Sequence, residues 1–276
     1  MKEISTMKKI FFGILATITI VACSRNAITG RSQLKLLPES QLQSMANQQY
    51  TEFLSANKVV STTSNKDAEM VNRVGRRISN AVTNYFASKG LSKSLEGYNW
   101  EYHLVDNKEA NAWCMPGGKI VVYTGLLPYT QNEAALAVVL GHEVSHAVLQ
   151  HGNERMSQML GAELVGAGLQ VAMSEKPQET QNAFYTAFGL GSQVGVLLPY
   201  ARKHEYEADH YGLIWAAMAG YNPKEAIPLW ERMEAASQNN LRPPEFLSDH
   251  PVETSRIKKI KEWMPEALGY YKPMGK

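Results

Sequence analysis

The chain has 276 residues, of which 44% are hydrophobic and 20% are charged, so it can bury a substantial globular core. Its formal net charge is only +2, which excludes a protein that binds nucleic acid through a strongly basic surface. The sequence contains neither a repeat at a solenoid period nor a low-complexity tract, so repeat architectures are excluded as well.

The N-terminus has the pattern of an export signal. Lys8 and Lys9 precede an apolar segment, 10–22, that is too short to span a bilayer as a stable helix. The segment ends in "IVAC", which resembles a bacterial lipobox and would make Cys23 the lipidated first residue of the mature protein. An ordinary secretory signal and an uncleaved anchor are the alternatives. Because Ser24 rather than an aspartate follows, resemblance to known sorting rules favours the outer membrane, with the protein facing the periplasm.

Helical patterns outnumber strand patterns along the rest of the chain. An apolar stripe from Val71 to Tyr85 repeats at three and four residues and predicts a helix that ends near Gly90. Residues 99–106 alternate like a strand, and residues 118–126 are β-branched and apolar, which predicts a second strand. Further helices are predicted over 39–57, 131–151, 154–174, 178–197, 202–219, 223–237 and 252–263.

This order of elements indicates an α+β fold that is mainly helical and contains a small β-sheet. We expect a lipoprotein signal peptide over 1–22, a tether over 23–38 and a single domain over 39–276. No function follows for the helices between 154 and 197.

One predicted helix contains the pattern His-Glu-x-x-His, in the stretch "VVLGHEVSHAVLQHG". Its expected start is a capping box, in which Thr130 and Glu133 satisfy free backbone N–H groups. His142 and His146 are four residues apart, so both imidazoles lie on one helical face and can reach one metal ion. Glu143 is rotated by about 100° and can serve as a general base beside the metal. The alternative is a buried helix that contains two histidines without a metal.

A hydrolytic zinc site needs a third protein ligand and an open fourth position. His151 is one residue out of phase with a third-histidine pattern, so we expect it to interact with the dipole at the helix C-terminus. The stretch "YARKHEYEADHYG" places Glu205 and Asp209 on one helical face, whereas Glu207 points elsewhere. We expect Glu205 to bind zinc and Asp209 to accept a hydrogen bond from a ligating histidine. A solvated charged helix face is the alternative.

These motifs carry a family resemblance. "HEVSH" followed by "ARKHEYEAD" resembles the gluzincin metallopeptidases of the HtpX and CAAX-prenyl-protease family, and more narrowly their soluble bacterial lipoprotein (LoiP-like) branch. "ITGRSQL", "NAWCMPGGKIVVYTGLL" and "SDHPVETSRI" also match, so the resemblance spans nearly the whole mature chain. It implies a zincin-type domain that holds one Zn²⁺ per chain through His142, His146 and Glu205, with Glu143 as the catalytic glutamate.

The segment "NAWCMPGG" is expected to bind substrate. An extended peptide can add itself as a strand to an exposed sheet edge through main-chain hydrogen bonds. Asn111 and Ala112 would offer those groups beside the zinc, and the Pro-Gly-Gly that follows would turn the chain away. A plain hairpin edge is the alternative. We expect Cys114, in the same segment, to be a buried small hydrophobe rather than a metal ligand.

A tetrahedral oxyanion needs a donor besides zinc, and the candidates are His250, Arg256 and Tyr200. The sequence does not choose among them. His250 ends the proline-rich polar stretch "NNLRPPEFLSDHP". We hypothesise that it reaches the fourth position on zinc and keeps the enzyme latent until substrate displaces it. A residue at the start of the next helix, before Pro251, is the alternative.

The expected protein is therefore a lipid-anchored zinc metalloendopeptidase of the bacterial cell envelope. The family resemblance implies misfolded or misassembled envelope proteins as substrates, in protein quality control. Binding of an extended strand agrees with this, because folded proteins rarely offer a free strand. One rival is a chaperone-like envelope lipoprotein with a structural zinc, and another is a zinc hydrolase that acts on cell-wall amides.

Overall fold

The structure is a computed structural model of the chain that describes residues 23–167, 179–180, 201–239, 246, 250 and 254–273. The expected signal peptide, nearly all of the helix expected at 178–197, the side chain of Cys23 and the whole of Tyr200 lie outside the described residues. Among the helices that are described, none has both the length and the apolar character needed to cross a membrane.

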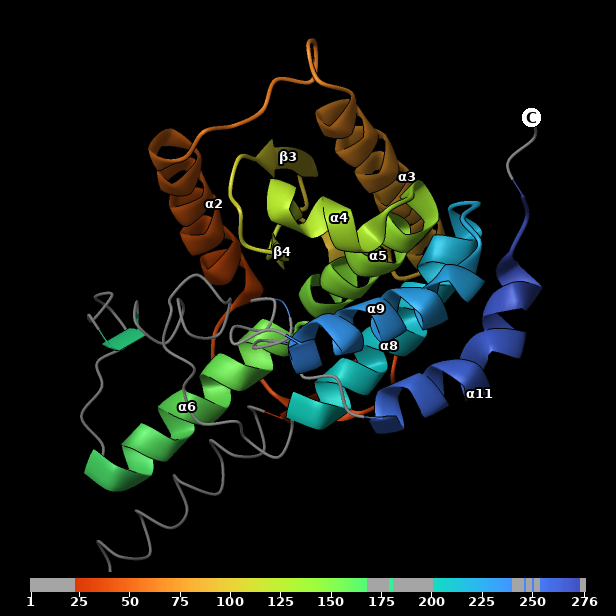
Figure 1. Cartoon of the computed structure of the whole chain (residues 1–276). Coiled ribbons are helices and arrows are strands. Elements are labelled where there is room, and N and C mark those ends of the chain that lie inside the picture. The colour runs from red at the N-terminus through yellow and green to blue at the C-terminus, as the bar shows by residue number, and fades with distance from the viewer. Residues whose placement is uncertain are drawn as a thin grey trace, which may run out of the picture.

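The described elements confirm the mainly helical α+β class (Figure 1). In chain order they are β1 (Cys23–Arg25), β2 (Ser32–Leu34), α2 (Glu39–Ala56), α3 (Lys66–Ser88), η1 (Ser92–Leu95), β3 (Glu101–Val105), β4 (Ala112–Met115), β5 (Lys119–Tyr123), η2 (Thr124–Leu126), α4 (Leu127–Thr130), α5 (Glu133–Val148), α6 (His151–Ala167), α8 (Ala201–Met218), η3 (Pro223–Glu225), α9 (Ala226–Asn239) and α11 (Thr254–Tyr270).

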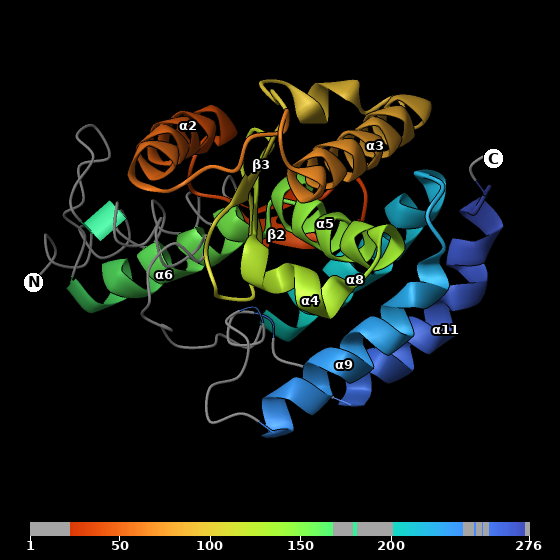
Figure 2. The same ribbon diagram turned by 45° about the horizontal axis from the view of Figure 1, so that its top comes forward.

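A three-stranded sheet lies between two groups of helices, in the order β3–β5–β4. β3 runs parallel to the central strand β5, and β4 runs antiparallel to it. Ile120 and Val122 of β5 belong to the core formed with α3, α5 and α8, whereas Val121 packs on the other face with α2 and α6. Both faces are therefore buried, with α2 on one side and α3 and α5 on the other (Figures 1 and 2).

Two glycines allow α5 and α8 to pack in close contact. A Cβ atom added at Gly141 would lie 2.6 Å from the carbonyl oxygen of Gly212, and one added at Gly212 would lie 2.7 Å from the backbone nitrogen of His142. A larger residue at either position would push the helices apart. The contact therefore sets the distance between the helix that carries the two histidines and the helix that carries the acidic residues.

Residues 23–38, expected to form a tether, fold onto the domain. β1 and β2 pair as antiparallel strands. The buried side chains of Asn26 and Gln33 both donate hydrogen bonds to the carbonyl oxygen of Leu149, at 3.0 Å and 2.8 Å. Arg31 reaches acidic residues on α6 and α8. This N-terminal segment is thus attached to the carboxyl end of α5 rather than standing free of the domain.

The capping box expected at the start of α5 is not formed. Asn132 is the N-cap residue, and its side-chain oxygen accepts a hydrogen bond from the backbone N–H of Ala135. Thr130 instead belongs to α4, where its hydroxyl donates to the carbonyl oxygen of Leu127. Thr130, the expected N-cap residue, is the last residue of the short helix α4, so the N-cap of α5 lies two residues later, at Asn132.

The break between α5 and α6 comes earlier than expected. α5 ends at Val148, Gln150 takes a left-handed conformation with φ of 60°, and His151 begins α6. The prediction that His151 lies at the carboxyl end of the first helix is therefore wrong. The left-handed turn brings its imidazole back against α5.

α11 is longer than the helix expected at 252–263 and continues to Tyr270. Pro265 lies inside it, where a proline removes a backbone N–H donor. Met264 and Ala267, on either side of the proline, are buried in the main core. Burial of this face keeps α11 helical through Pro265, where the local sequence alone favours the end of a helix.

Candidate active site

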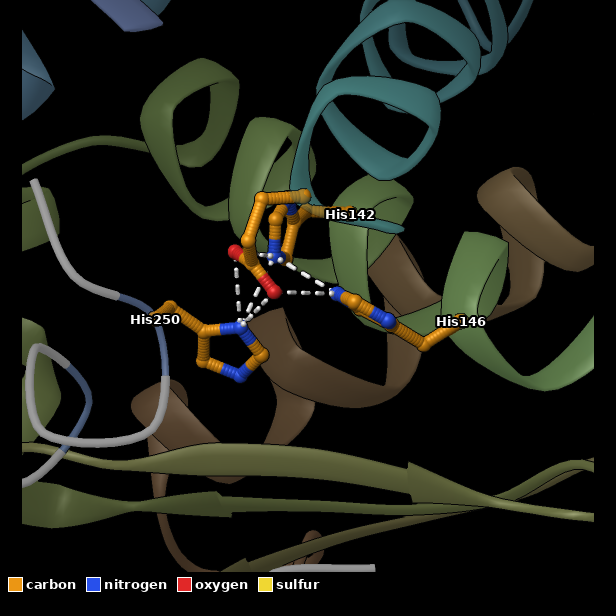
Figure 3. A group of neighbouring side chains, drawn as sticks. His142, His146 and His250 are labelled. Atoms are coloured by element: carbon orange, nitrogen blue, oxygen red, sulfur yellow. Dashed lines mark hydrogen bonds and ion pairs between the residues drawn. The ribbon is translucent and has the colours of Figure 1, made fainter. Parts of the chain in front are cut away.

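Four side chains converge between α5 and α8. His142 and His146 come from α5, Glu205 from α8 and His250 from the chain before α11, and one ligand atom of each lies within 4.8 Å of the others. Figure 3 shows the three imidazoles turned toward one another around a carboxylate. The Nε2 atoms of His142 and His146 are 3.0 Å apart, and the Glu205 oxygens lie 3.4 Å and 3.3 Å from them. The structure thus brings together the three expected ligands.

The charges around this group fit a divalent cation. The carboxylates of Glu143, Glu205 and Asp209 are all buried, and the guanidinium of Arg256 lies 3.1 Å from Glu205 and 2.8 Å from Asp209. With neutral imidazoles, three carboxylates and one guanidinium leave two negative charges in a desolvated place, which is unfavourable unless a proton on a histidine or a metal cation adds positive charge. Two imidazole nitrogens and a carboxylate are also the donors that zinc prefers.

His142 is oriented by Asp209, at the position that the sequence predicts. Asp209 Oδ1 lies 3.0 Å from His142 Nδ1, and Arg256 donates to both Asp209 oxygens at 2.8 Å. Burial lowers the pKa of His142, but Asp209 and Glu205 outweigh that effect and raise the pKa to about 9. A bound metal cation would take the place of the proton at Nε2, while Nδ1 keeps its proton and donates a hydrogen bond to Asp209.

Arg256, one of the three expected oxyanion donors, serves these carboxylates. Besides Asp209 and Glu205, it donates to the carbonyl oxygen of His250 at 3.1 Å and lies 4.2 Å from the centre of the Trp230 ring. Its side chain is fully buried behind the ligands. In this structure Arg256 is therefore an electrostatic anchor for the carboxylates of Glu205 and Asp209.

His146 has a partner that the sequence did not suggest. His151 is fully buried, and its Nδ1 lies 3.0 Å from Nδ1 of His146. Its other nitrogen, Nε2, lies 2.9 Å from Glu207, which points away from the metal ligands as expected. Burial keeps the pKa of His151 well below its ordinary value, so this ring is neutral. Helical spacing did not reveal the contact, because it depends on the left-handed turn at Gln150.

Glu143 and His250 face each other at the edge of the group. Glu143 is buried, and its Oε1 lies 3.4 Å from Nε2 of His250. Nδ1 of His250 lies 3.0 Å from Glu205 and 3.2 Å from Nε2 of His142. His250 therefore lies among the ligand atoms, next to the residue expected to act as the general base.

β4 is an edge strand of the sheet and packs against α5. The carbonyl oxygen of Asn111 accepts a hydrogen bond from the N–H of Tyr123, so this group faces β5. By the alternation of an antiparallel pair, the main-chain groups of Ala112 and Cys114 point away from β5. The Ala112 N–H there donates to the side chain of Asn111 at 2.8 Å. Of the two residues expected to receive substrate, only Ala112 presents its backbone to the edge.

Cys114 is buried within the main core and is not among the grouped ligand atoms. Burial raises the pKa of its thiol well above the ordinary value, which keeps it protonated. The expectation of a small buried hydrophobe agrees with this environment.

A comparison with protein families places the chain. The model of peptidase family M48 matches residues 71–264, from α3 to α11. The chain belongs to peptidase family M48. The matched region includes the helices that carry His142, His146 and Glu205. Membership of M48 confirms the interpretation of the His-Glu-x-x-His pattern as that of a zinc metallopeptidase.

Several relatives of this M48 chain are named as proteases. Mitochondrial metalloendopeptidase OMA1 of Schizosaccharomyces pombe is 35% identical over 190 residues, which cover 69% of this chain and 53% of the relative. Its human counterpart is 29% identical over 245 residues, covering 87% and 46%. The beta-barrel assembly-enhancing protease of Escherichia coli is 30% identical over 161 residues, covering 57% and 33%. The chain thus spans about half or less of the length of these relatives.

Proposed function

We propose that this chain is a zinc-dependent metalloendopeptidase whose ligands are His142, His146 and Glu205. The observation that carries the proposal is the convergence of these three side chains beside the buried carboxylate of Glu143. A zinc ion held there would supply a Lewis acid that polarises the scissile carbonyl and acidifies water. Glu143 would accept the proton of the attacking water and then deliver it to the leaving amine.

The proposed substrates are extended segments of misfolded or misassembled envelope proteins. The edge position of β4 supports this, since the main-chain groups of Ala112 and Cys114 point away from β5, where strand pairing does not depend on the sequence of the substrate. Two kinds of relative also support it: a mitochondrial metalloendopeptidase and a protease named for enhancing β-barrel assembly. A folded protein rarely presents a free strand, so strand pairing selects unfolded segments.

The proposed location is the bacterial cell envelope, with the protein in the lipoprotein branch of the family and anchored through lipid on Cys23, in the outer membrane on its periplasmic side. The support is the apolar segment at 10–22 that ends in "IVAC". Because β1 begins at Cys23, such an anchor would hold the folded domain directly at the membrane surface. Incorporation of labelled palmitate into the wild type, and its absence from Cys23→Ala, would support the anchor; equal labelling of both would contradict it.

The peptidase proposal is tested with Glu143→Gln, which keeps the size and polarity of the side chain but cannot accept the proton. We expect one zinc per chain in both the wild type and Glu143→Gln, and a fall in kcat on an unfolded, fluorescently labelled protein of about 10²- to 10⁴-fold. Glu205→Ala should lose the zinc, because it removes one of three ligands.

The same preparations separate the rival functions. Suppression of aggregation by both the wild type and Glu143→Gln, without cleavage by either, would contradict the peptidase and favour the chaperone-like protein. Release of fragments from purified cell wall, with no peptides from the unfolded protein, would favour an amide hydrolase of the wall.

A further inference from the structure

We propose that Glu207, anchored by Arg31 of the N-terminal segment, is a positioning residue for the metal ligand His146 and acts through the imidazole of His151. The inference rests on the proposed function, because it assigns a role toward the same metal. It adds His151, Glu207 and Arg31 to the groups that hold the site, and Arg31 lies more than a hundred residues before the helix that carries His146.

The hydrogen-bond direction can be followed from the carboxylate inward. An ionised carboxylate only accepts hydrogen bonds, so the Nε2 of His151, 2.9 Å from Glu207, is the donor. In a neutral imidazole the other nitrogen is then an acceptor. Nδ1 of His146, 3.0 Å from Nδ1 of His151, must therefore donate. This leaves Nε2 of His146 with its lone pair directed at Glu205 and His142, as a metal ligand requires.

Arg31 holds the far end of this chain of hydrogen bonds. Its Nε lies 2.7 Å from Glu207, and its Nη1 and Nη2 atoms each lie 2.6 Å from Glu154. The side chains of Arg31 and Glu207 are 19% and 17% exposed, so solvent screens their pairing only in part. His204 stacks on His151 with ring centroids 4.4 Å apart and an angle of 10°, which fixes the plane of the ring.

The two histidine ligands are thus supported in parallel ways. His142 donates directly to Asp209, which Arg256 holds through two hydrogen bonds of 2.8 Å. His146 is connected to Glu207 through one additional ring, and Arg31 takes the role of the second guanidinium. In each case an arginine-held carboxylate determines which ring nitrogen keeps the proton.

The test compares Glu207→Gln with Glu154→Gln in the mature chain from residue 23 onward. Both variants remove a carboxylate that Arg31 contacts, but only Glu207 forms a hydrogen bond with the imidazole that contacts His146. Glu154 hydrogen-bonds His204, which only stacks on that ring. We expect the zinc affinity of Glu207→Gln, measured by competition with a chromophoric chelator, to fall 10- to 100-fold. For Glu154→Gln we expect a lower melting temperature of the zinc-free protein and a zinc affinity within about 3-fold of wild type.

His151→Phe gives a second reading, because phenylalanine preserves the ring that stacks on His204 but removes both nitrogens. It should weaken zinc binding as much as Glu207→Gln and change the visible absorption of the Co²⁺-substituted protein, since the orientation of His146 changes.

Wild-type zinc affinity in either Glu207→Gln or His151→Phe would overturn the proposal. An equal loss of zinc affinity in Glu154→Gln and Glu207→Gln would also overturn it. Such a result would mean that any disturbance of the contacts of Arg31 weakens zinc binding. Zinc affinity and Co²⁺ absorption are measured without peptidase activity. A wild type that binds zinc but cleaves no peptide bond would contradict the proposed function and leave the test of Glu207 intact.

Discussion

His250 lies among the grouped ligand atoms of the candidate metal site. Its Nδ1 lies 3.0 Å from Glu205, and its Nε2 lies 3.4 Å from Glu143, so it occupies the space beside the general base. The backbone around it is held, because its N–H donates to Phe246 and its carbonyl accepts from Arg256. We propose that His250 fills the fourth metal position in the resting state, in keeping with the latency hypothesis.

We expect His250→Ala to cleave an unfolded reporter about 2- to 10-fold faster than wild type, because the competing ligand is gone. Zinc affinity should fall at the same time, since one donor is lost. Initial rates and zinc competition on the same preparations check both effects. An unchanged or lower rate would contradict the latency role and leave His250 as a substrate-contacting or structural residue.

At the scale of the elements, the site depends on how closely α5 approaches α8. The histidines and the acidic ligand belong to different helices, and the contact of Gly141 with Gly212 sets the space between them. Glycine inside a helix costs about 1 kcal/mol relative to alanine. Here the glycines permit a close contact between α5 and α8, and the packing of that contact offsets the cost. The same contact brings the proposed ligands within reach of one ion.

Gly141→Ala should therefore destabilise the fold by about 1–3 kcal/mol and weaken zinc binding, since a Cβ atom would lie 2.6 Å from the carbonyl oxygen of Gly212. Gly269→Ala in α11 is the matched control, because an added Cβ there meets no atom within 4 Å. The control should be neutral or up to about 1 kcal/mol more stable. Chemical denaturation of the zinc-free proteins measures both; equal effects would contradict the packing argument.

The ion pair between Arg31 and Glu154 predicts that the attachment of the N-terminal segment to α6 weakens at low pH. Burial alone would raise the pKa of Glu154, but hydrogen bonds from His204 and Arg31 lower it from 4.5 to about 2. A carboxyl whose pKa is depressed by folding stabilises the protein above its unfolded pKa, and the stabilisation is lost as the pH falls through the folded pKa. Because solvent screens part of this interaction, the contribution at neutral pH is at most about 3 kcal/mol.

We therefore expect the difference in unfolding free energy between wild type and Glu154→Gln to be largest above pH 5 and to narrow steadily between pH 4.5 and pH 2, the interval bounded by the two pKa values. Urea titrations in the presence of a chelator, at several pH values, give the difference directly. A difference that is constant over this interval would show that Glu154 is not ionised against Arg31 and His204.

For the whole molecule, the metal would join parts of the chain that are distant in sequence. The grouped donors come from α5, α8 and the residue His250, so a bound ion cross-links the two sides of the fold. Zinc at 100 times its dissociation constant should raise the stability by about 2.7 kcal/mol. Thermal melting with zinc and with chelator should therefore give separate transitions for wild type and a single zinc-independent transition for Glu205→Ala. Identical wild-type transitions would contradict the metal site.

From the amino-acid order alone, the residues proposed as metal ligands and general base could be named, and so could Asp209 as the partner of His142. His142 and His146 share one helix, and Glu205 and Asp209 share another, so helical periodicity sets their relative directions. The mainly helical α+β class followed from the same periodicity. The narrower assignments, to a lipid anchor and to envelope substrates, remain proposals.

Other features of the site depend on packing between segments that are far apart in the chain. Arg31 is 123 residues from Glu154 and 176 residues from Glu207, and no local pattern links them. The contact of His151 with His146 needs a left-handed turn at a non-glycine residue, which helical spacing does not predict. Periodicity fixes directions within one element, whereas distances between elements depend on how the cores pack, because side-chain volume and buried charge are satisfied across the whole fold.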